Sequence, residues 1–155
     1  MPALSVSSKP GAIELPDPAP ISDDDLDTVG YTLYGEARGE PLEGQQAVAW
    51  VIRNRATWQP PEWWGATPGE VCLKPQQFSC WNKDDPNYTL LQGLSLGDQT
   101  FLALRAIAED VFDGAIADPT GGATHYYADS IQPPAWAKDH PWIRIGRLLF
   151  YRIGP

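Results

Sequence analysis

The chain is poor in the residue types that carry metal, redox and nucleic-acid chemistry. Its 155 residues include only two Cys, two His and one Met. Lys and Arg together number 11 against 20 Asp and Glu, which gives a net charge of −9. Nucleic-acid binding and adhesion to anionic membranes both depend on Lys and Arg. We therefore expect no nucleic-acid partner and no stable membrane association, and no residue spacing predicts a metal site or a cofactor site.

Long apolar runs are also absent, and the N-terminus lacks the basic start and apolar core of a secretory signal. Residues 1–21 contain five Pro and no helical or strand period, which predicts a flexible, Pro-rich acidic arm. The remaining residues, 22–155, have the length and the 43% hydrophobic content of one globular domain. We expect this domain to be a monomer.

The apolar spacing predicts an α+β domain that is mainly helical, with a small antiparallel sheet. Ser22 followed by three Asp residues is typical of a helix start, because the hydroxyl caps the first turn and the acids suit the helix dipole. Residues 56–97 have no long period and predict a functional surface loop. The predicted helices are 23–38, 41–55, 68–72 and 98–112, and the predicted strands are 123–128 and 148–153, which could pair with each other.

Glu36 is the strongest candidate for chemistry. It lies between Gly35 and Ala37, beside the apolar face of the first predicted helix. A carboxyl in such surroundings is poorly solvated, so it can keep its proton near neutral pH and act as a general acid. The alternative is an ordinary surface Glu that pairs with Arg38 or Arg55.

Glu40 follows four residues later and would share a helix face with Glu36 if the helix continued. Gly39 and Pro41 interrupt that continuity. We therefore expect Glu40 to serve the start of the second helix, where the helix dipole favours an acid.

The two cysteines, Cys72 and Cys80, lie eight residues apart and leave two alternatives open. They could form a disulfide across the long loop, or they could remain two reduced thiols. A third possibility is a nucleophilic pair of Cys80 with His125, although nothing near Cys80 marks a thiol of low pKa.

The long loop also carries Gln77, Phe78 and Trp81, a mixture of amide and aromatic side chains. Sugar recognition uses such a mixture, because pyranose faces pack on rings while amides bind hydroxyl and acetamido groups. The alternative is that Phe78 and Trp81 anchor the loop to the core.

A second polar and aromatic cluster runs from Thr124 to Tyr127. Alternate residues of a strand point to opposite faces. We therefore expect either Thr124 and Tyr126, or His125 and Tyr127, to face a cleft, but not both pairs.

Several segments, taken in order, resemble the SleB/CwlJ cell wall hydrolases. The resemblance covers roughly residues 26–152, and one departure is Leu148, where the family usually has His. The matching segments are residues 34–40, 44–49 and 54–55 in the first half, residues 77–79 in the middle, and residues 122–127, 134–136, 145–146 and 150–151 near the C-terminus.

The resemblance implies a lysozyme-like catalytic domain that acts on peptidoglycan glycan strands. Members that are lytic transglycosylases cleave the β-1,4 bond between N-acetylmuramic acid and N-acetylglucosamine and leave a 1,6-anhydro end. The catalytic Glu of the family maps to Glu36, and one carboxyl suffices if the muramic C6 hydroxyl is the nucleophile. The expected substrate-binding residues are Gln77, Phe78, Trp81, Thr124, His125, Tyr126 and Tyr151.

Three alternatives to a transglycosylase stay open at this point. They are a muramidase-type hydrolase, a Cys-His peptidase that cuts the stem peptide, and a non-catalytic module that binds peptidoglycan. The substrate lies outside the cytoplasm, whereas no signal peptide is visible. A phage endolysin released through a holin, or an enzyme carried on the virion, would reconcile the two.

Overall fold

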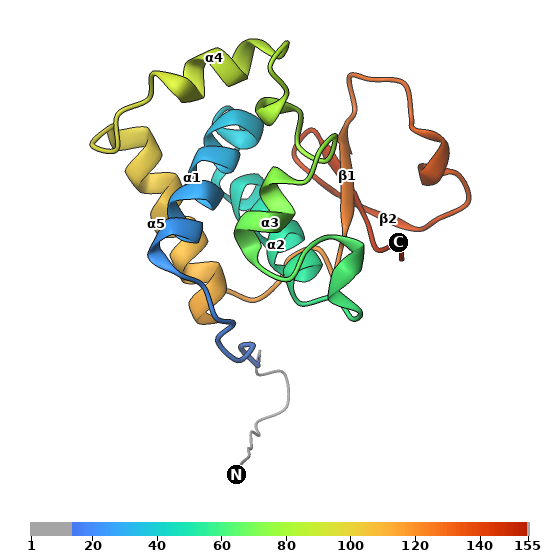
Figure 1. The fold of residues 1–155 in the computed structure, drawn as a ribbon. Helices are drawn as coiled ribbons and strands as arrows, with labels where there is room; N and C mark the ends of the chain where they lie inside the picture. The colour runs from blue at the N-terminus through green and yellow to red at the C-terminus, as the bar shows by residue number, and fades with distance from the viewer. Residues whose placement is uncertain (1–13, 155) are drawn as a thin grey trace.

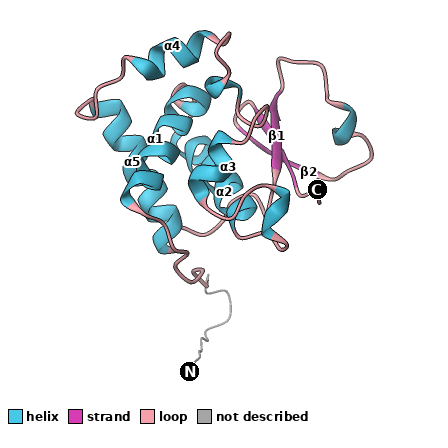
Figure 2. Cartoon of the chain, in the orientation of Figure 1, coloured by secondary structure: helices cyan, strands magenta, loops and turns pink. Residues whose placement is uncertain are grey.

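A computed structural model describes residues 14–154 as a helical body with a small sheet on one side (Figures 1 and 2). This confirms the predicted α+β class. The helices are α1 (Asp23–Ala37), α2 (Leu42–Ala56), α3 (Pro68–Leu73), α4 (Pro86–Gln92) and α5 (Gln99–Asp113). Short 3-10 turns are η1 (Pro61–Trp63), η2 (Ser79–Trp81) and η3 (Ala135–Ala137), and the strands are β1 (His125–Ala128), β2 (Trp142–Ile145) and β3 (Leu148–Tyr151).

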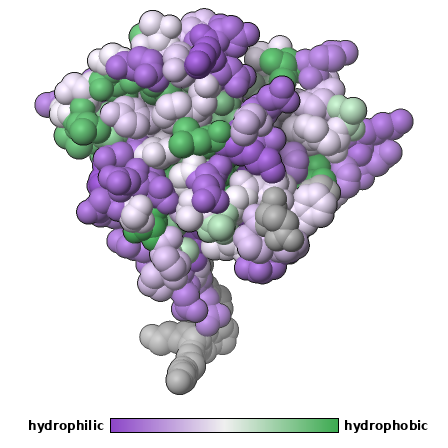
Figure 3. Space-filling model, viewed as in Figure 1, coloured by the Kyte–Doolittle hydropathy of each residue, from purple (hydrophilic) through white to green (hydrophobic). Residues whose placement is uncertain are grey.

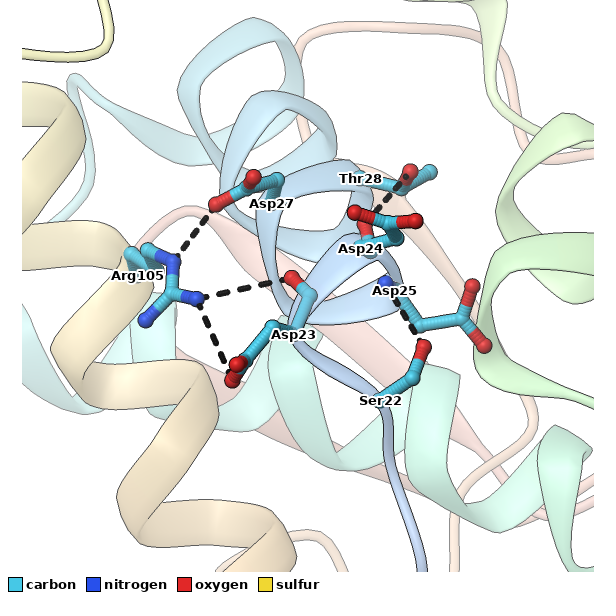
Figure 4. Close-up of polar contacts among 7 residues, drawn as sticks. All are labelled: Ser22, Asp23, Asp24, Asp25, Asp27, Thr28 and Arg105. Atoms are coloured by element: carbon cyan, nitrogen blue, oxygen red, sulfur yellow. Dashed lines mark hydrogen bonds and ion pairs between the residues drawn. The ribbon is translucent and has the colours of Figure 1, made fainter.

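Helix α1 starts as the sequence predicts. The Ser22 hydroxyl accepts a hydrogen bond from the Asp25 N–H at 3.1 Å, which satisfies one free donor of the first turn (Figure 4). On the other side of the turn, Arg105 of α5 donates to Asp27 at 2.6 Å and lies 3.8 Å from the Asp23 carboxylate. The cap fixes where α1 begins, and the ion pairs fix its position on α5.

The hydrophobic core lies between α1, α2 and α5. Each long helix buries an apolar stripe at helical spacing, as the sequence predicts. Helix α5 ends at Gly114, which adopts the left-handed conformation (φ 79°) that favours glycine. Core residues that are less than 2% exposed include Val29, Leu33, Val48, Ile52, Leu104 and Val111.

Part of the predicted N-terminal arm, residues 1–13, lies outside the described residues. The following residues, 14–21, run without secondary structure against the end of α5. The Ala19 N–H donates to the Phe112 carbonyl at 2.8 Å, and the buried Arg53 guanidinium donates to the carbonyls of Asp17 and Val111. These bonds attach the segment to α2 and α5.

The sheet is antiparallel, with β3 between the other two strands. The predicted pairing of residues 123–128 with residues 148–153 is confirmed, because β1 pairs with β3 and Tyr126 lies opposite Phe150. Strand β2 leaves no signal in the sequence, because three of its four residues are exposed and show no alternating pattern. This strand forms by pairing with β3 through a tight turn at Gly146, which has a φ of 59°.

Helix α4 lies inside residues 56–97, where the sequence predicts a long loop. Asp85 caps it by accepting the Asn87 N–H at 2.8 Å, and Pro86 occupies its first position. Leu91 is its only buried residue, so a helical period cannot be seen in the sequence.

The face drawn in Figure 3 is mainly hydrophilic, and its apolar residues form small separate patches. None of the helices within residues 14–154 is both long and apolar enough to cross a membrane.

Candidate active site

A cleft of about 790 Å³ runs between the C-terminal end of α1, the loop around η2 and strand β1. It brings together residues that are far apart in the sequence. Its lining includes Glu36, Glu40, Arg55, Gln77, Phe78, Ser79, His125, Tyr126, Tyr127, Trp136 and Leu148.

Glu36 projects into this cleft from the last turn of α1, and three donors hold its carboxyl group. The Tyr126 hydroxyl donates to Oε1 at 3.0 Å. The Cys80 N–H and the Ser79 hydroxyl donate to Oε2 at 3.0 and 3.4 Å. Because these donors come from β1 and from η2, the carboxyl is fixed against both sides of the cleft.

The alternative of a surface Glu paired with an arginine does not match the structure. Arg38 donates to the Tyr34 carbonyl at 2.8 Å and lies over the Tyr34 ring. Arg55 donates instead to the Thr124 carbonyl at 2.7 Å. Within residues 14–154, Glu36 forms no ion pair within 4 Å.

Arg55 forms the floor of the cleft and is only 6% exposed. Its guanidinium lies over the rings of Trp64 and Phe78, and it donates to the Thr124 carbonyl and, at 3.1 Å, to the Gln77 side chain. Burial lowers the pKa of Arg55 to about 10, so the group is still a cation at neutral pH. Arg55 therefore ties α2 to the residue that precedes β1 and to the loop before η2.

The Tyr126 hydroxyl remains protonated at any ordinary pH. Burial and the neighbouring Glu36 carboxylate raise the pKa of Tyr126 well above its usual value. The phenol is therefore a permanent donor to Glu36, while its ring packs against Phe150 with centroids 5.6 Å apart.

His125 is neutral, and its tautomer follows from its contacts. The Thr124 hydroxyl donates to the Ile153 carbonyl, so it accepts from His125 Nδ1 at 2.9 Å. The Nε2 lone pair is then available as an acceptor. Burial, helped by the positive charge of Arg55 and by His140, lowers the pKa of His125 to about 4.

Trp136, in η3, is a cleft residue that the sequence analysis did not single out. Its ring centroid lies 4.9 Å from that of His125, 5.4 Å from Tyr151 and 5.9 Å from Tyr127. The sequence does contain a signal for Trp136, because residues 134–136 are one of the segments that resemble the family.

Residues of both faces of β1 line the cleft, which corrects the expectation that only one face would do so. Tyr126 faces Glu36, whereas His125 and Tyr127 face Trp136. The reason is that β1 is an edge strand, so the cleft extends around its free side.

Glu40 does not serve the start of α2, which corrects a second expectation. It precedes the N-cap Pro41, and its Oε2 accepts from Arg147 at 2.8 Å. The side chain is 9% exposed and lines the cleft, so the cleft contains a second carboxylate that is already engaged in an ion pair.

Gln77, Phe78, His125 and Tyr126 lie in the cleft with Glu36, and their role in substrate binding stays a prediction. Trp81, Thr124 and Tyr151 do not line the cleft, which corrects their expected position. The Trp81 indole donates to Thr32 at 2.9 Å, and Thr124 and Tyr151 are 0% and 3% exposed. Phe78 is itself 2% exposed, so it anchors the loop while forming part of the cleft base.

Cys72 and Cys80 are free and buried, so the structure contains two thiols and not a disulfide. Burial raises the pKa of Cys72 to about 12, and burial together with Glu36 raises that of Cys80 further. Neither forms a thiolate at neutral pH, which argues against a Cys-His nucleophile.

Two carboxyl groups line the cleft, and within the described residues Glu40 is in an ion pair whereas Glu36 is not. Among the side chains that the structure describes, no three His, Cys, Asp or Glu residues are grouped closely enough to hold a metal ion. Leu148, where the family usually has His, contributes an apolar surface and no titratable group.

The sequence profile of the cell wall hydrolase family matches residues 39–151. The chain belongs to this family. The match begins three residues after Glu36, so the assignment of that residue depends on the cleft geometry and on the resemblance of residues 34–40.

Curated relatives include two spore cortex-lytic enzymes. The protein of Halalkalibacterium halodurans is 37% identical over 134 residues, which are 86% of this chain and 36% of the relative. The protein of Bacillus subtilis is 31% identical over 134 residues, again 86% of this chain and 39% of the relative. The chain therefore spans about two fifths of the length of these relatives.

Two solved structures have the same fold. The catalytic domain of Bacillus cereus SleB has a TM-score of 0.68 and 29% identity, with 87% of this chain and 94% of that chain covered. The catalytic domain of the germination-specific lytic transglycosylase SleB from Bacillus anthracis has a TM-score of 0.66 and 30% identity, with 86% and 98% covered. These matches are consistent with the predicted lysozyme-like α+β fold.

Proposed function

We propose that this chain is a peptidoglycan-degrading lytic transglycosylase with Glu36 as its single catalytic carboxyl. The observation that carries the proposal is the position of Glu36 in the cleft, with donors from β1 and η2 fixing both of its oxygens. The Bacillus anthracis structure, 30% identical over nearly its whole length, is that of a lytic transglycosylase.

The reaction begins with proton transfer from Glu36 to the oxygen between muramic C1 and glucosamine C4. The C1–O bond breaks, the glucosamine leaves with a free 4-hydroxyl, and positive charge develops at muramic C1. The muramic C6 hydroxyl attacks C1, and the Glu36 carboxylate takes its proton. The products are a 1,6-anhydro end and a regenerated acid, with no water consumed.

The donors around Glu36 support this cycle. Between the two proton transfers the carboxylate is charged, and Tyr126 and the Cys80 N–H each give it a charge-assisted hydrogen bond. The same bonds keep the group in one orientation for both steps.

A muramidase-type hydrolase is the second candidate, because Glu40 is another carboxylate in the same cleft. A hydrolase needs a second carboxylate that acts on water or on the sugar. Glu40 is bound to Arg147, which favours the transglycosylase.

The decisive variant is Glu36→Gln, assayed by release of soluble muropeptides from purified peptidoglycan. We expect a loss of about 1,000-fold, in the range that general acid catalysis contributes. The matched control is Glu43→Gln, an exposed acid in the first turn of α2. Retained activity in Glu36→Gln would remove this residue from its role.

The same assay separates the remaining alternatives. New amino groups from cut stem peptides would identify a peptidase, and binding without soluble products would identify a binding module. Delivery of the enzyme to the wall by a phage, through a holin or on a virion, stays a prediction.

A further inference from the structure

Gly35 lies where α1 meets the η2 turn. A Cβ atom added to Gly35 would lie 2.4 Å from Cys80 Cβ and 2.8 Å from Cys80 Sγ. Real side chains do not approach so closely, and Cys80 is fully buried, so it cannot move away without displacing its neighbours. Only glycine at position 35 allows this contact between the two segments.

Glycine is an unfavourable residue inside a helix, so its presence in α1 points to a packing requirement. Gly39, just past the end of α1, provides the contrast. A Cβ at that position would have no neighbour within 4 Å.

The close contact has a consequence at the next residue. Cys80 approaches α1 so closely that its N–H donates to Glu36 Oε2 at 3.0 Å. Ser79, in the same turn, places its hydroxyl 3.4 Å from the same oxygen. The indole of Trp81 donates to Thr32 at 2.9 Å, which anchors the other end of the turn one helical turn earlier on α1.

We propose that Gly35 and Cys80 form a positioning contact, in which the missing side chain at Gly35 lets the Cys80 N–H hold the Glu36 carboxyl in its catalytic orientation. The inference rests on the proposed function, because it assumes that Glu36 is the acid. Neither Gly35 nor the Cys80 thiol touches the substrate; both act through Glu36.

Three variants test the contact: Gly35→Ala, Gly39→Ala, and the double variant Gly35→Ala with Cys80→Gly. The extra methyl of Gly35→Ala displaces η2, so kcat should fall by about 100-fold, as misplacement of a catalytic group by an ångström can cause. KM should change much less than kcat, because the rings of His125, Tyr127 and Trp136 on the sheet side keep their positions. Gly39→Ala should match the wild type.

The double variant is the specific control for folding. Removing the Cys80 side chain makes room for the new methyl, since the next neighbour of a Cβ at position 35 is Leu91 Cδ1 at 3.5 Å. We expect kcat in the double variant to return to within about tenfold of the wild type. Equal kcat in Gly35→Ala and the wild type, or a folded double variant no more active than Gly35→Ala, would overturn the inference.

A readout that does not depend on activity is the amide NMR signal of Cys80. In the wild type the amide proton should be shifted downfield of its random-coil position, because the N–H is bonded to a carboxylate at 3.0 Å. The downfield shift should shrink in Glu36→Gln and in Gly35→Ala, and return at residue 80 of the double variant, where Gly replaces Cys. An unchanged residue 80 shift in Gly35→Ala would contradict the contact.

The two proposals fail in different ways. If Glu36→Gln is active, the proposed function fails, whereas the Cys80 signal still shows whether the contact exists. If Glu36→Gln is inactive and Gly35→Ala is fully active, only the positioning contact fails.

Discussion

The two walls of the cleft are built differently. On the helical wall, α1 and η2 provide one carboxyl, Glu36, and two donors that fix it. On the sheet wall, the ring centroid of Trp136 lies 4.9 Å from that of His125 and 5.9 Å from that of Tyr127. The first arrangement suits proton transfer at one point, and the second suits packing against the faces of sugar rings.

The difference suggests a division of work between catalysis and binding. Variants of the helical wall, and of Tyr126, which reaches Glu36 from β1, should lower kcat. Variants of the ring group His125, Tyr127 and Trp136 should raise KM. Arg55 donates to Thr124, next to β1, and to Gln77, next to η2, so replacing Arg55 should change both kcat and KM.

Arg55→Met should have the largest effect. It removes the donors to the Thr124 carbonyl and to Gln77 inside a buried site, and should cost about 3 kcal/mol of unfolding free energy. Urea denaturation and steady-state kinetics would measure it. The control is Arg144→Met, which breaks an exposed pair with Asp129 and should cost less than about 1 kcal/mol. Equal losses in the two variants would contradict a joining role for Arg55.

Tyr126→Phe should lower kcat by about tenfold, because one hydrogen bond to a charged Glu36 is lost while the ring packing remains. Tyr151→Phe removes the hydroxyl of a tyrosine that does not line the cleft, and its kcat should be unchanged. A rise in KM alone in Tyr126→Phe would show that Tyr126 acts in sugar binding with His125, Tyr127 and Trp136, and not through Glu36.

Trp136→Ala should raise KM by about fivefold with kcat little changed, as expected for the loss of about 1 kcal/mol of ring packing. Trp142→Ala is the control, since this Trp on β2 is 53% exposed and lies outside the cleft lining. Kinetics on soluble glycan fragments would distinguish them. A large fall in kcat in Trp136→Ala would mean that the sheet wall also orients the reaction.

The smallest effect concerns pH. In the folded chain the pKa of His125 is lowered to about 4, whereas in the unfolded chain it is about 6.5. Between pH 4 and pH 6.5, therefore, only the unfolded chain takes up a proton at His125. This contribution to stability is complete above pH 6.5 and is lost as the pH falls toward 4. Between pH 7 and 5 the wild type should lose about 1 kcal/mol more than His125→Asn, after allowance for partial solvent exposure. Urea denaturation at both pH values measures it, and equal losses would mean that His125 is not held neutral.

The helical half of the fold could be predicted because its signals are local. Ser22 caps α1, and the apolar spacing of the long helices matches a buried stripe. Helix α4 and strand β2 each bury a single residue, Leu91 and Ile145, so neither leaves a period in the sequence. Their formation depends on neighbours that only the folded chain provides.

The candidate site shows the same limit. The position of Glu36 in the cleft could be predicted because its local segment is unusual, while its catalytic role stays a prediction that rests on the resemblance. Residue type alone did not show that Trp81 turns toward the core, or that Trp136 reaches the cleft from η3. The position of Glu40 could not be predicted from local sequence, because its ion-pair partner Arg147 is more than one hundred residues away along the chain.

The most direct test of the central claim is the mass of the muropeptides that the wild-type enzyme releases from purified peptidoglycan. A one-carboxyl transglycosylase consumes no water, so the new muramic ends should be 1,6-anhydro and one water lighter than reducing ends. Reducing muramic ends, lost in Glu40→Gln, would contradict the account and show a hydrolase that uses both carboxylates of the cleft.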